Sequence, residues 1–213
     1  KSDLIERQQQ NPPFGGLMAS SAQQLRRGYQ SPGPINDPEG FGEDYWRFAR
    51  GMYAAGIRRG DLVHNSFSYH LTPAGAMVES GAHAIGCAVI PAGVGNTEIQ
   101  AQIIASLKPT AYGGTPSFLK IVLEKGAELG LDTSSLRKGL VGGEALPKSL
   151  RRAIRDLGVE PYSGYGTADV GLIAYESRAL EGMIVDEGIL LEIVEPGGQF
   201  PVAEGDVGEV VVT

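Results

Sequence analysis

Residues 97–129, TEIQAQIIASLKPTAYGGTPSFLKIVLEKGAEL, contain the pattern that decides the fold. Residues 98–107 place apolar side chains at the three- and four-residue spacing of an amphipathic helix. Residues 109–114 form a short glycine-rich segment that is typical of a buried strand, and residues 116–129 return to helical spacing. Helix, strand and helix in direct succession predict part of a parallel α/β sheet.

The first of these helices has two local features. Ile99, Ile103 and Leu107 share one face, as in a helix with an apolar stripe. Thr97 and Gln100 have the spacing of a capping box, in which the two side chains bond each other's backbone amides. These two residues therefore mark the predicted start of the helix.

The same alternation continues on both sides of this segment. Strands are predicted at residues 61–67, 87–91, 139–143 and 159–166, and helices at residues 44–57, 72–86 and 147–157. Such regular alternation predicts an α/β fold with βα repeats, right-handed crossovers and a mostly parallel sheet. From Met183 onward strands and turns follow without helices, which predicts the start of an antiparallel β element. Two parts are expected, an α/β core at 1–182 and a strand-rich part at 183–213.

The composition excludes several classes of protein. The chain has 213 residues, 42% of them hydrophobic, and a net charge of −7. No basic run exceeds a pair, so nucleic-acid binding is not expected, and no segment approaches the roughly 18 apolar residues of a membrane span. Cys87 is the only cysteine, which fits a reducing cytoplasm. Both ends read as the interior of a protein, so the chain is expected to be a piece of a longer one.

Three glycine-rich loops follow predicted strands: PAGVGN at 91–96, VGGEALP at 141–147 and SGYGTADVG at 163–171. In open α/β sheets ligands bind beyond the carboxyl ends of the strands. In the last loop Gly164 and Gly166 let a ligand approach the backbone, and Tyr165 offers a face to a planar ring. Asp169 either holds Mg²⁺ beside phosphates or complements a helix dipole, and the pattern alone leaves both open.

The loop at residues 141–147 is also open to two interpretations, a ligand site or a plain turn. Gly142 and Gly143 open the strand end, and Glu144, Ala145 and Leu146 would line a ring pocket. A plain turn between a strand and a helix explains the same residues at least as well.

Other chemistries have less support. The segments GVGNTE and GYGTAD match two glycines of the dinucleotide loop G-x-G-x-x-G, but an acid replaces the third, which argues against a dinucleotide-dependent oxidoreductase. No G-x-S-x-G elbow for a nucleophilic serine occurs. The three histidines lack metal-ligand spacing, although His64 and His70 flank a strand's carboxyl end, where a ligand could bind.

Five segments in order resemble the phenylacetate–CoA ligase branch of the adenylate-forming enzymes: residues 13–17, 63–119, 134–147, 162–176 and 186–213. The resemblance covers essentially the whole chain and implies the core of that family's large N-terminal domain. It implies that a carboxylic acid, most readily an aromatic one such as phenylacetate, is activated with ATP and Mg²⁺ and then joined to coenzyme A. It also implies a small-molecule acid as partner and a cytoplasmic location, and it allows a homodimer.

The resemblance assigns roles to individual residues. The residues implied to contact the nucleotide are Gly143, Glu144, Ala145, Ser163, Gly164, Tyr165, Gly166 and Thr167, with Tyr165 stacked on adenine. The residues implied to line the acid pocket are Phe67, Tyr69, His70 and Thr72. Asp169 takes the place of the family's metal-binding glutamate, and it and Thr167 are the implied catalytic residues.

Two departures from the family pattern keep a second function open. Residues 28–36, GYQSPGPIN, stand where the phosphate loop is expected, and their prolines remove backbone donors. Ala168 occupies a position where the family motif has a hydroxyl, although Thr167 beside it could supply one. The alternative to an acid–CoA ligase is a non-catalytic relative that senses a nucleotide or acyl ligand. The chain alone is not expected to complete the reaction, because the family's ribose-binding aspartate and C-terminal domain would lie beyond it.

Overall fold

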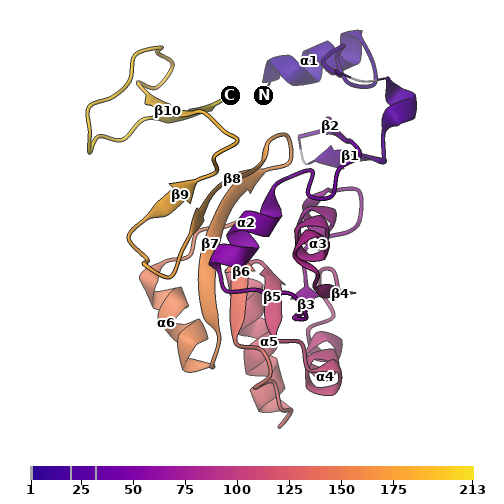
Figure 1. Ribbon diagram of the computed structural model, residues 1–213, viewed down its shortest axis with the longest axis vertical. Helices are drawn as coiled ribbons and strands as arrows, with labels where there is room; N and C mark the ends of the chain where they lie inside the picture. Colours follow the sequence, from indigo (N-terminus) through magenta and orange to yellow (C-terminus); the bar gives the residue numbers. More distant parts are fainter. Residues whose placement is uncertain (1, 20, 32) are drawn as a thin grey trace.

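The computed structural model describes residues 2–19, 21–31 and 33–213, and its centre is a mixed β-sheet (Figure 1). Among the described residues this sheet has seven strands in the order β4-β3-β5-β6-β7-β8-β9. Their bounds are β3 Leu62–Asn65, β4 Ala88–Pro91, β5 Ala111–Gly114, β6 Lys138–Val141, β7 Glu160–Thr167, β8 Gly171–Glu176 and β9 Met183–Val185. Pairing is parallel from β4 to β7 and antiparallel from β7 to β9. The predicted α/β class is confirmed.

Helices cover both faces of the sheet. Their bounds are α2 Phe48–Ala54, α3 Ala74–Ile85, α4 Thr97–Leu107, α5 Pro116–Glu128 and α6 Lys148–Asp156. Leu140 of β6 packs into one core with residues of α2 and α3, and its neighbour Val141 packs into a second core with residues of α4, α5 and α6. This alternation is the two-residue period of a strand buried on both sides. Each fully buried side chain, such as Ile104, stabilises the fold by about 1.5–3 kcal/mol.

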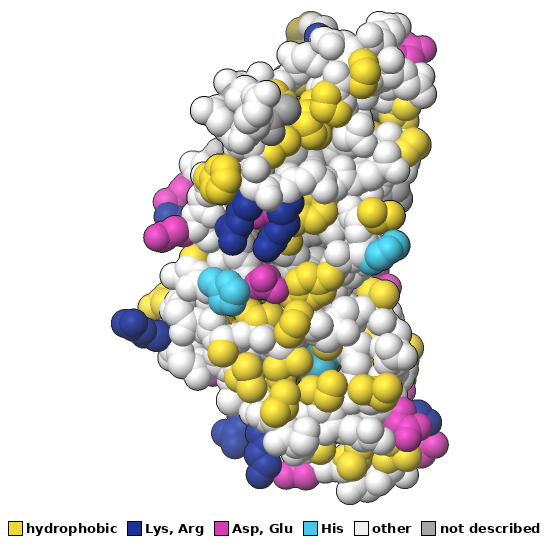
Figure 2. All heavy atoms as spheres, turned by 90° about the vertical axis from the view of Figure 1, so that its right-hand side faces the viewer, with side chains coloured by type: hydrophobic (Ala, Val, Ile, Leu, Met, Phe, Trp, Pro, Cys, Tyr) yellow, Lys and Arg dark blue, Asp and Glu magenta, His cyan; other side chains and the backbone are white. Residues whose placement is uncertain are grey.

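The apolar stripe of α4 faces outward. Ile99 and Leu107 are 54% and 55% exposed, whereas Ala101 and Ile104 are buried. The side of the molecule that carries β4 and α4 shows apolar side chains gathered over its lower half (Figure 2). The strand predicted at residues 87–91 is present as β4, an edge strand with partly exposed residues.

The predicted capping box at the start of α4 is wrong. The N-cap is Asn96, and no side chain caps the helix. The Gln100 amide instead donates to the Gly93 and Gly95 carbonyls over 2.8 and 2.7 Å, and its oxygen lies 2.7 Å from His64 Nε2. Gln100 is therefore buried in the loop that precedes its own helix.

The chain does not enter a helix after β7. It turns at residues 167–171 and runs back as β8, antiparallel to β7. The helix-dipole role, which the sequence left open for Asp169, is therefore wrong, because no helix begins there. A tight hairpin explains the same glycine-rich sequence.

The remaining elements lie at the two ends of the chain. At the start are α1 Ser2–Gln10, a 3₁₀ turn at Ala22–Gln24, and a hairpin of β1 Arg27–Ser31 with β2 Ile35–Glu39. At the end, β10 Leu191–Val194 pairs with β11 Glu209–Val212. The boundary between residues 182 and 183 stays a prediction. In the described part of the chain, no helix combines the length and the apolar character needed to cross a membrane.

Candidate active site

A cavity of about 300 Å³ lies at the carboxyl edge of the sheet, where β6 and β7 end and α3 begins. Its apolar lining includes Phe48, Met77, Val78 and Leu140. Of the residues expected at the site, it is also lined by Phe67, Thr72, Gly143, Gly164, Gly166 and Thr167. Two loops and one helix start thus meet at the edge where ligands of α/β sheets bind. A larger hollow of about 570 Å³ lies at the opposite edge, where Lys138 and Asp61 pair with each other over 2.7 Å.

The turn at residues 167–171 forms one end of this cavity. Within it, the Val170 amide donates to Thr167 Oγ1 over 3.2 Å. From the start of α2, Arg47 donates to the carbonyls of Val170 and Leu172 over 2.6 and 3.2 Å. The turn is therefore held by a side chain more than a hundred residues away in sequence, which sequence periodicity could not have found.

The glycines of this turn are required by the chain itself. A β-carbon on Gly171, whose φ is +87°, would lie 2.6 Å from the Trp46 carbonyl oxygen. A β-carbon on Gly166 would lie 2.5 Å from the Gly171 carbonyl oxygen. Real side chains do not come this close to backbone, so both positions need glycine whether or not a ligand binds.

The expected nucleotide contacts fall into two groups. Tyr165 is 43% exposed, so its ring is open to a partner. Glu144 instead accepts a hydrogen bond from the Ser117 amide over 2.7 Å, which caps the start of α5. Ala145 is exposed and, like Glu144 and Ser163, is outside the cavity lining.

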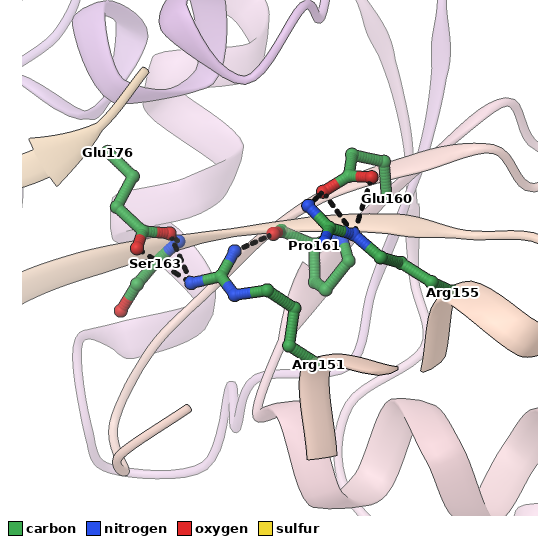
Figure 3. A network of polar contacts seen from close by, with 6 residues as sticks. All are labelled: Arg151, Arg155, Glu160, Pro161, Ser163 and Glu176. Atoms are coloured by element: carbon green, nitrogen blue, oxygen red, sulfur yellow. Dashed lines mark hydrogen bonds and ion pairs between the residues drawn. The ribbon is translucent and has the colours of Figure 1, made fainter. Parts of the chain in front are cut away.

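Ser163 lies in a network that joins α6 to β7 and β8 (Figure 3). Its amide donates to Glu176 over 2.7 Å, and Arg151 forms two bonds of 2.6 and 2.8 Å to the same carboxylate. Arg151 also donates to the Pro161 carbonyl over 2.7 Å. The Ser163 amide is thus engaged in holding the strand below the turn.

The segment expected to bind the acid is divided. Phe67 and Thr72 line the cavity, whereas Tyr69 and His70 lie outside its lining. The Tyr69 hydroxyl donates to Glu79 over 2.8 Å and accepts from Asn65 over 2.7 Å, and burial and then Glu79 raise its pKa. This tyrosine packs the loop onto α3.

His64 is fully buried against Gln100, so it is not placed to meet a ligand in the cavity. Burial lowers the pKa of its ring, and the hydrogen bond that Nε2 donates to the Gln100 side-chain oxygen only partly opposes this. The ring is therefore neutral at pH 7, in the role of a packed core residue.

Asp169 faces a second carboxylate that sequence patterns missed. Asp37 of β2 is only 3% exposed, and its Oδ2 has no hydrogen-bond partner. Burial raises the pKa of Asp37, as does the adjacent Asp169, whereas hydrogen bonds from Ser31 lower it. Ser31 lines the cavity, as do Thr167 and Ala168, which precede Asp169, so the acid pair is adjacent to residues of the cavity wall. In the sequence this residue is an aspartate that directly follows the altered loop of residues 28–36.

The carboxylates of Asp37 and Asp169 fit the coordination of a divalent cation. Mg²⁺ prefers one or two carboxylates and fills its other positions with water and phosphate oxygens. The described residues contain no group of three or more histidine, cysteine or acidic side chains that could hold a metal, so a closed protein cage is not what the site resembles. The orphaned oxygen of Asp37 beside Asp169 suits the open kind of site.

Comparison with known proteins gives the family. The profile described as AMP-binding enzyme matches residues 69–213. Phenylacetate-coenzyme A ligase of Aromatoleum evansii is 31% identical, with 100% of this chain and 50% of that protein covered. Phenylacetate-coenzyme A ligase of Escherichia coli K12 is 33% identical, with 100% and 51% covered. The chain spans about half the length of these relatives.

A solved structure agrees. An open conformation of 2-hydroxyisobutyryl-CoA ligase, in complex with 2-HIB-AMP and CoA, superposes with a TM-score of 0.90 at 25% identity. The match covers 100% of this chain and 50% of that one. Since the matching profile covers more than half of the chain and the site lies at the expected edge, this chain belongs to the AMP-binding enzyme family.

Proposed function

We propose that the full-length protein is an acid–CoA ligase. In this proposal ATP activates a carboxylic acid to an acyl-adenylate, and the acyl group then passes to coenzyme A. The observation that carries it is the single cavity wall shared by the turn after β7, the loop after β6 and the segment with Phe67 and Thr72. The family and its ligase relatives support the same reaction.

The cavity favours a small apolar acid. Its volume of about 300 Å³ is at the lower end of the range for small-molecule sites, and its walls are mostly apolar. An aromatic acid of the phenylacetate class fits this description. The nucleotide would lie outside, near the exposed ring of Tyr165.

Adenylation requires little covalent participation by protein side chains. Adenylation needs the acid carboxylate placed in line with a phosphate and the phosphate charge neutralised. The rigid turn would position Thr167, and Asp169 would hold a Mg²⁺ that neutralises phosphate charge. ATP–pyrophosphate exchange with a panel of acids tests the proposal. Exchange that depends on an aromatic acid supports it, and ATP binding without exchange contradicts it.

One feature favours the sensor as a second candidate. Where the phosphate loop is expected, residues 28–31 and 35–36 are paired as strands of the β1–β2 hairpin, so these residues do not form an open loop. Pro32, one of the prolines in this segment, lies outside the described residues. A protein that binds ATP and an acid but shows no exchange would be this sensor.

Thr72→Val in the full-length protein is expected to change which acid is preferred, while ATP affinity stays unchanged. The substitution keeps the shape of a side chain that lines the cavity and removes its hydroxyl. Selectivity between acids should shift by roughly 1–3 kcal/mol. The measurement is kcat/KM for pairs of acids. Tyr69→Phe, outside the lining, is the control, and a larger shift in that variant would refute the pocket assignment.

Tyr165→Ala is expected to weaken ATP binding about fivefold, because a stacking face worth on the order of 1 kcal/mol is lost. The ring is exposed, so the fold should be retained. Calorimetry measures the affinity, with Tyr165→Phe as a control that keeps the aromatic face. Equal ATP affinity in the alanine variant would remove adenine stacking from the proposal.

The proposal includes Mg²⁺ as the metal, the cytoplasm as location and a homodimer as assembly. The single, buried, free Cys87 supports a reducing compartment. The apolar residues of the edge strand β9, which are more than 40% exposed, support a further contact on that side. Cell fractionation and sedimentation of the full-length protein test these two points.

A further inference from the structure

The acid pair of Asp37 and Asp169 is the most unusual electrostatic feature of the described residues. Asp37 is buried in β2 and makes no ion pair with any described residue, and its Oδ2 has no hydrogen-bond partner. The neighbouring buried acid on the same strand, Glu39, also has one oxygen, Oε1, without a hydrogen-bond partner, but its charge is compensated by arginines. It is surrounded by Arg26 and Arg27 at 3.7 and 3.4 Å and accepts a hydrogen bond from Tyr29.

The difference between these two acids points to a missing counter-charge. A buried carboxylate without a cation is costly unless it binds a proton or a metal ion. Apart from burial, two neighbours affect the pKa of Asp37. The hydroxyl and amide of Ser31 lower it, and the second carboxylate, Asp169, raises it. Two carboxylates in contact repel each other, so the pair favours a bound positive charge.

The acid pair lies next to residues that line the cavity, so a cation could reach it from there. Ser31 bonds Asp37 and also lines the cavity, and Thr167 and Ala168, which precede Asp169, line it too. Asp169 is exposed, so the pair has one buried and one accessible carboxylate. A small ion that entered from the cavity side would meet oxygen atoms of both acids.

We propose that Asp37 is the second protein ligand of the divalent cation that Asp169 holds, so that strand β2 and the turn between β7 and β8 share one metal. The β1–β2 hairpin, which stands where the phosphate loop is expected, would then contribute a carboxylate to the metal. Two carboxylates, with water and phosphate oxygens completing the shell, match the usual coordination of Mg²⁺. The proposal rests on the proposed function for the role of the metal but not for metal binding itself.

The test is metal binding without catalysis. Mn²⁺ replaces Mg²⁺ as probe, and its binding to the full-length protein is followed by electron paramagnetic resonance in the absence of nucleotide. Wild type should bind one Mn²⁺ at this site, and Asp37→Asn should weaken it at least tenfold. Asp206→Asn removes an exposed carboxylate in the loop between β10 and β11 and should bind Mn²⁺ as wild type does.

A second measurement keeps the proposal testable if Asp37→Asn does not fold. Crystals of the wild-type full-length protein grown with Mn²⁺ should show an anomalous peak within coordination distance of both carboxylates. A peak on Asp169 alone, or wild-type Mn²⁺ affinity in folded Asp37→Asn, would overturn the proposal.

Failure of this inference differs from failure of the proposed function. If Asp169→Asn loses Mn²⁺ but Asp37→Asn keeps it, the ligase proposal stands and Asp37 is not a ligand. If both variants lose Mn²⁺ but wild type shows no pyrophosphate exchange with any acid, the metal site stands and the ligase proposal fails.

Discussion

Asp169→Asn in the full-length protein is expected to lower the rate of Mg²⁺-dependent adenylation on the order of a hundredfold or more. Removal of one group that stabilises charge in a transition state typically has an effect of this size. The fold should survive, because asparagine is nearly isosteric and relieves the repulsion from Asp37. The measurement is ATP–pyrophosphate exchange as a function of Mg²⁺ concentration.

The control for this variant is Asp206→Asn, which makes the same change of charge at an exposed loop position. It should leave both the exchange rate and the Mg²⁺ requirement unchanged. Wild-type exchange with an unchanged Mg²⁺ requirement in Asp169→Asn would show that this carboxylate is not a metal ligand.

Gly171→Ala is expected to destabilise the protein by about 3–4 kcal/mol. The added β-carbon would lie 2.6 Å from the Trp46 carbonyl oxygen, which already accepts a hydrogen bond from the Leu172 amide over 2.9 Å. A left-handed backbone adds about 1–2 kcal/mol for any residue with a β-carbon, and the clash with backbone adds the rest. Denaturant unfolding of the full-length protein measures the change.

Gly158→Ala is a matched control for this prediction. Gly158 has a similar φ of +94°, but a β-carbon there would meet nothing within 4 Å. The free energy of unfolding of Gly158→Ala should fall only by the contribution of the left-handed backbone, about 1–2 kcal/mol. Equal losses in the two variants would mean that Trp46 can move away, and that the turn is less tightly held than the structure indicates.

The sheet could be predicted because its signal is local. Periodicity within each segment predicted β3, β5, β6 and the helices that join them, and all of these are present. The face of α4 was not predictable in the same way. Its apolar stripe faces outward because Gln100, a polar residue, is buried by bonds to His64 and to two carbonyls of its own loop. Only the tertiary structure supplies those partners.

The site was predictable to the extent that it follows from topology. Loops that succeed parallel strands must meet at one edge, and Gly143, Gly164 and Thr72 do meet there. Asp37 was not predictable, because it comes from a hairpin outside the repeating pattern. Tyr69 lies in the predicted segment, but its hydroxyl bonds Glu79 and its side chain is not part of the lining of this cavity.

The hydrogen bonds from Arg47 to the turn after β7 have a consequence for the thermodynamics of ligand binding. Loops that are loose in the free protein lose conformational entropy when a ligand orders them, and affinity falls accordingly. Here the carbonyls of Val170 and Leu172 are fixed by one guanidinium before any ligand arrives. Folding has already restricted this turn, so association with a ligand leaves its mobility nearly unchanged.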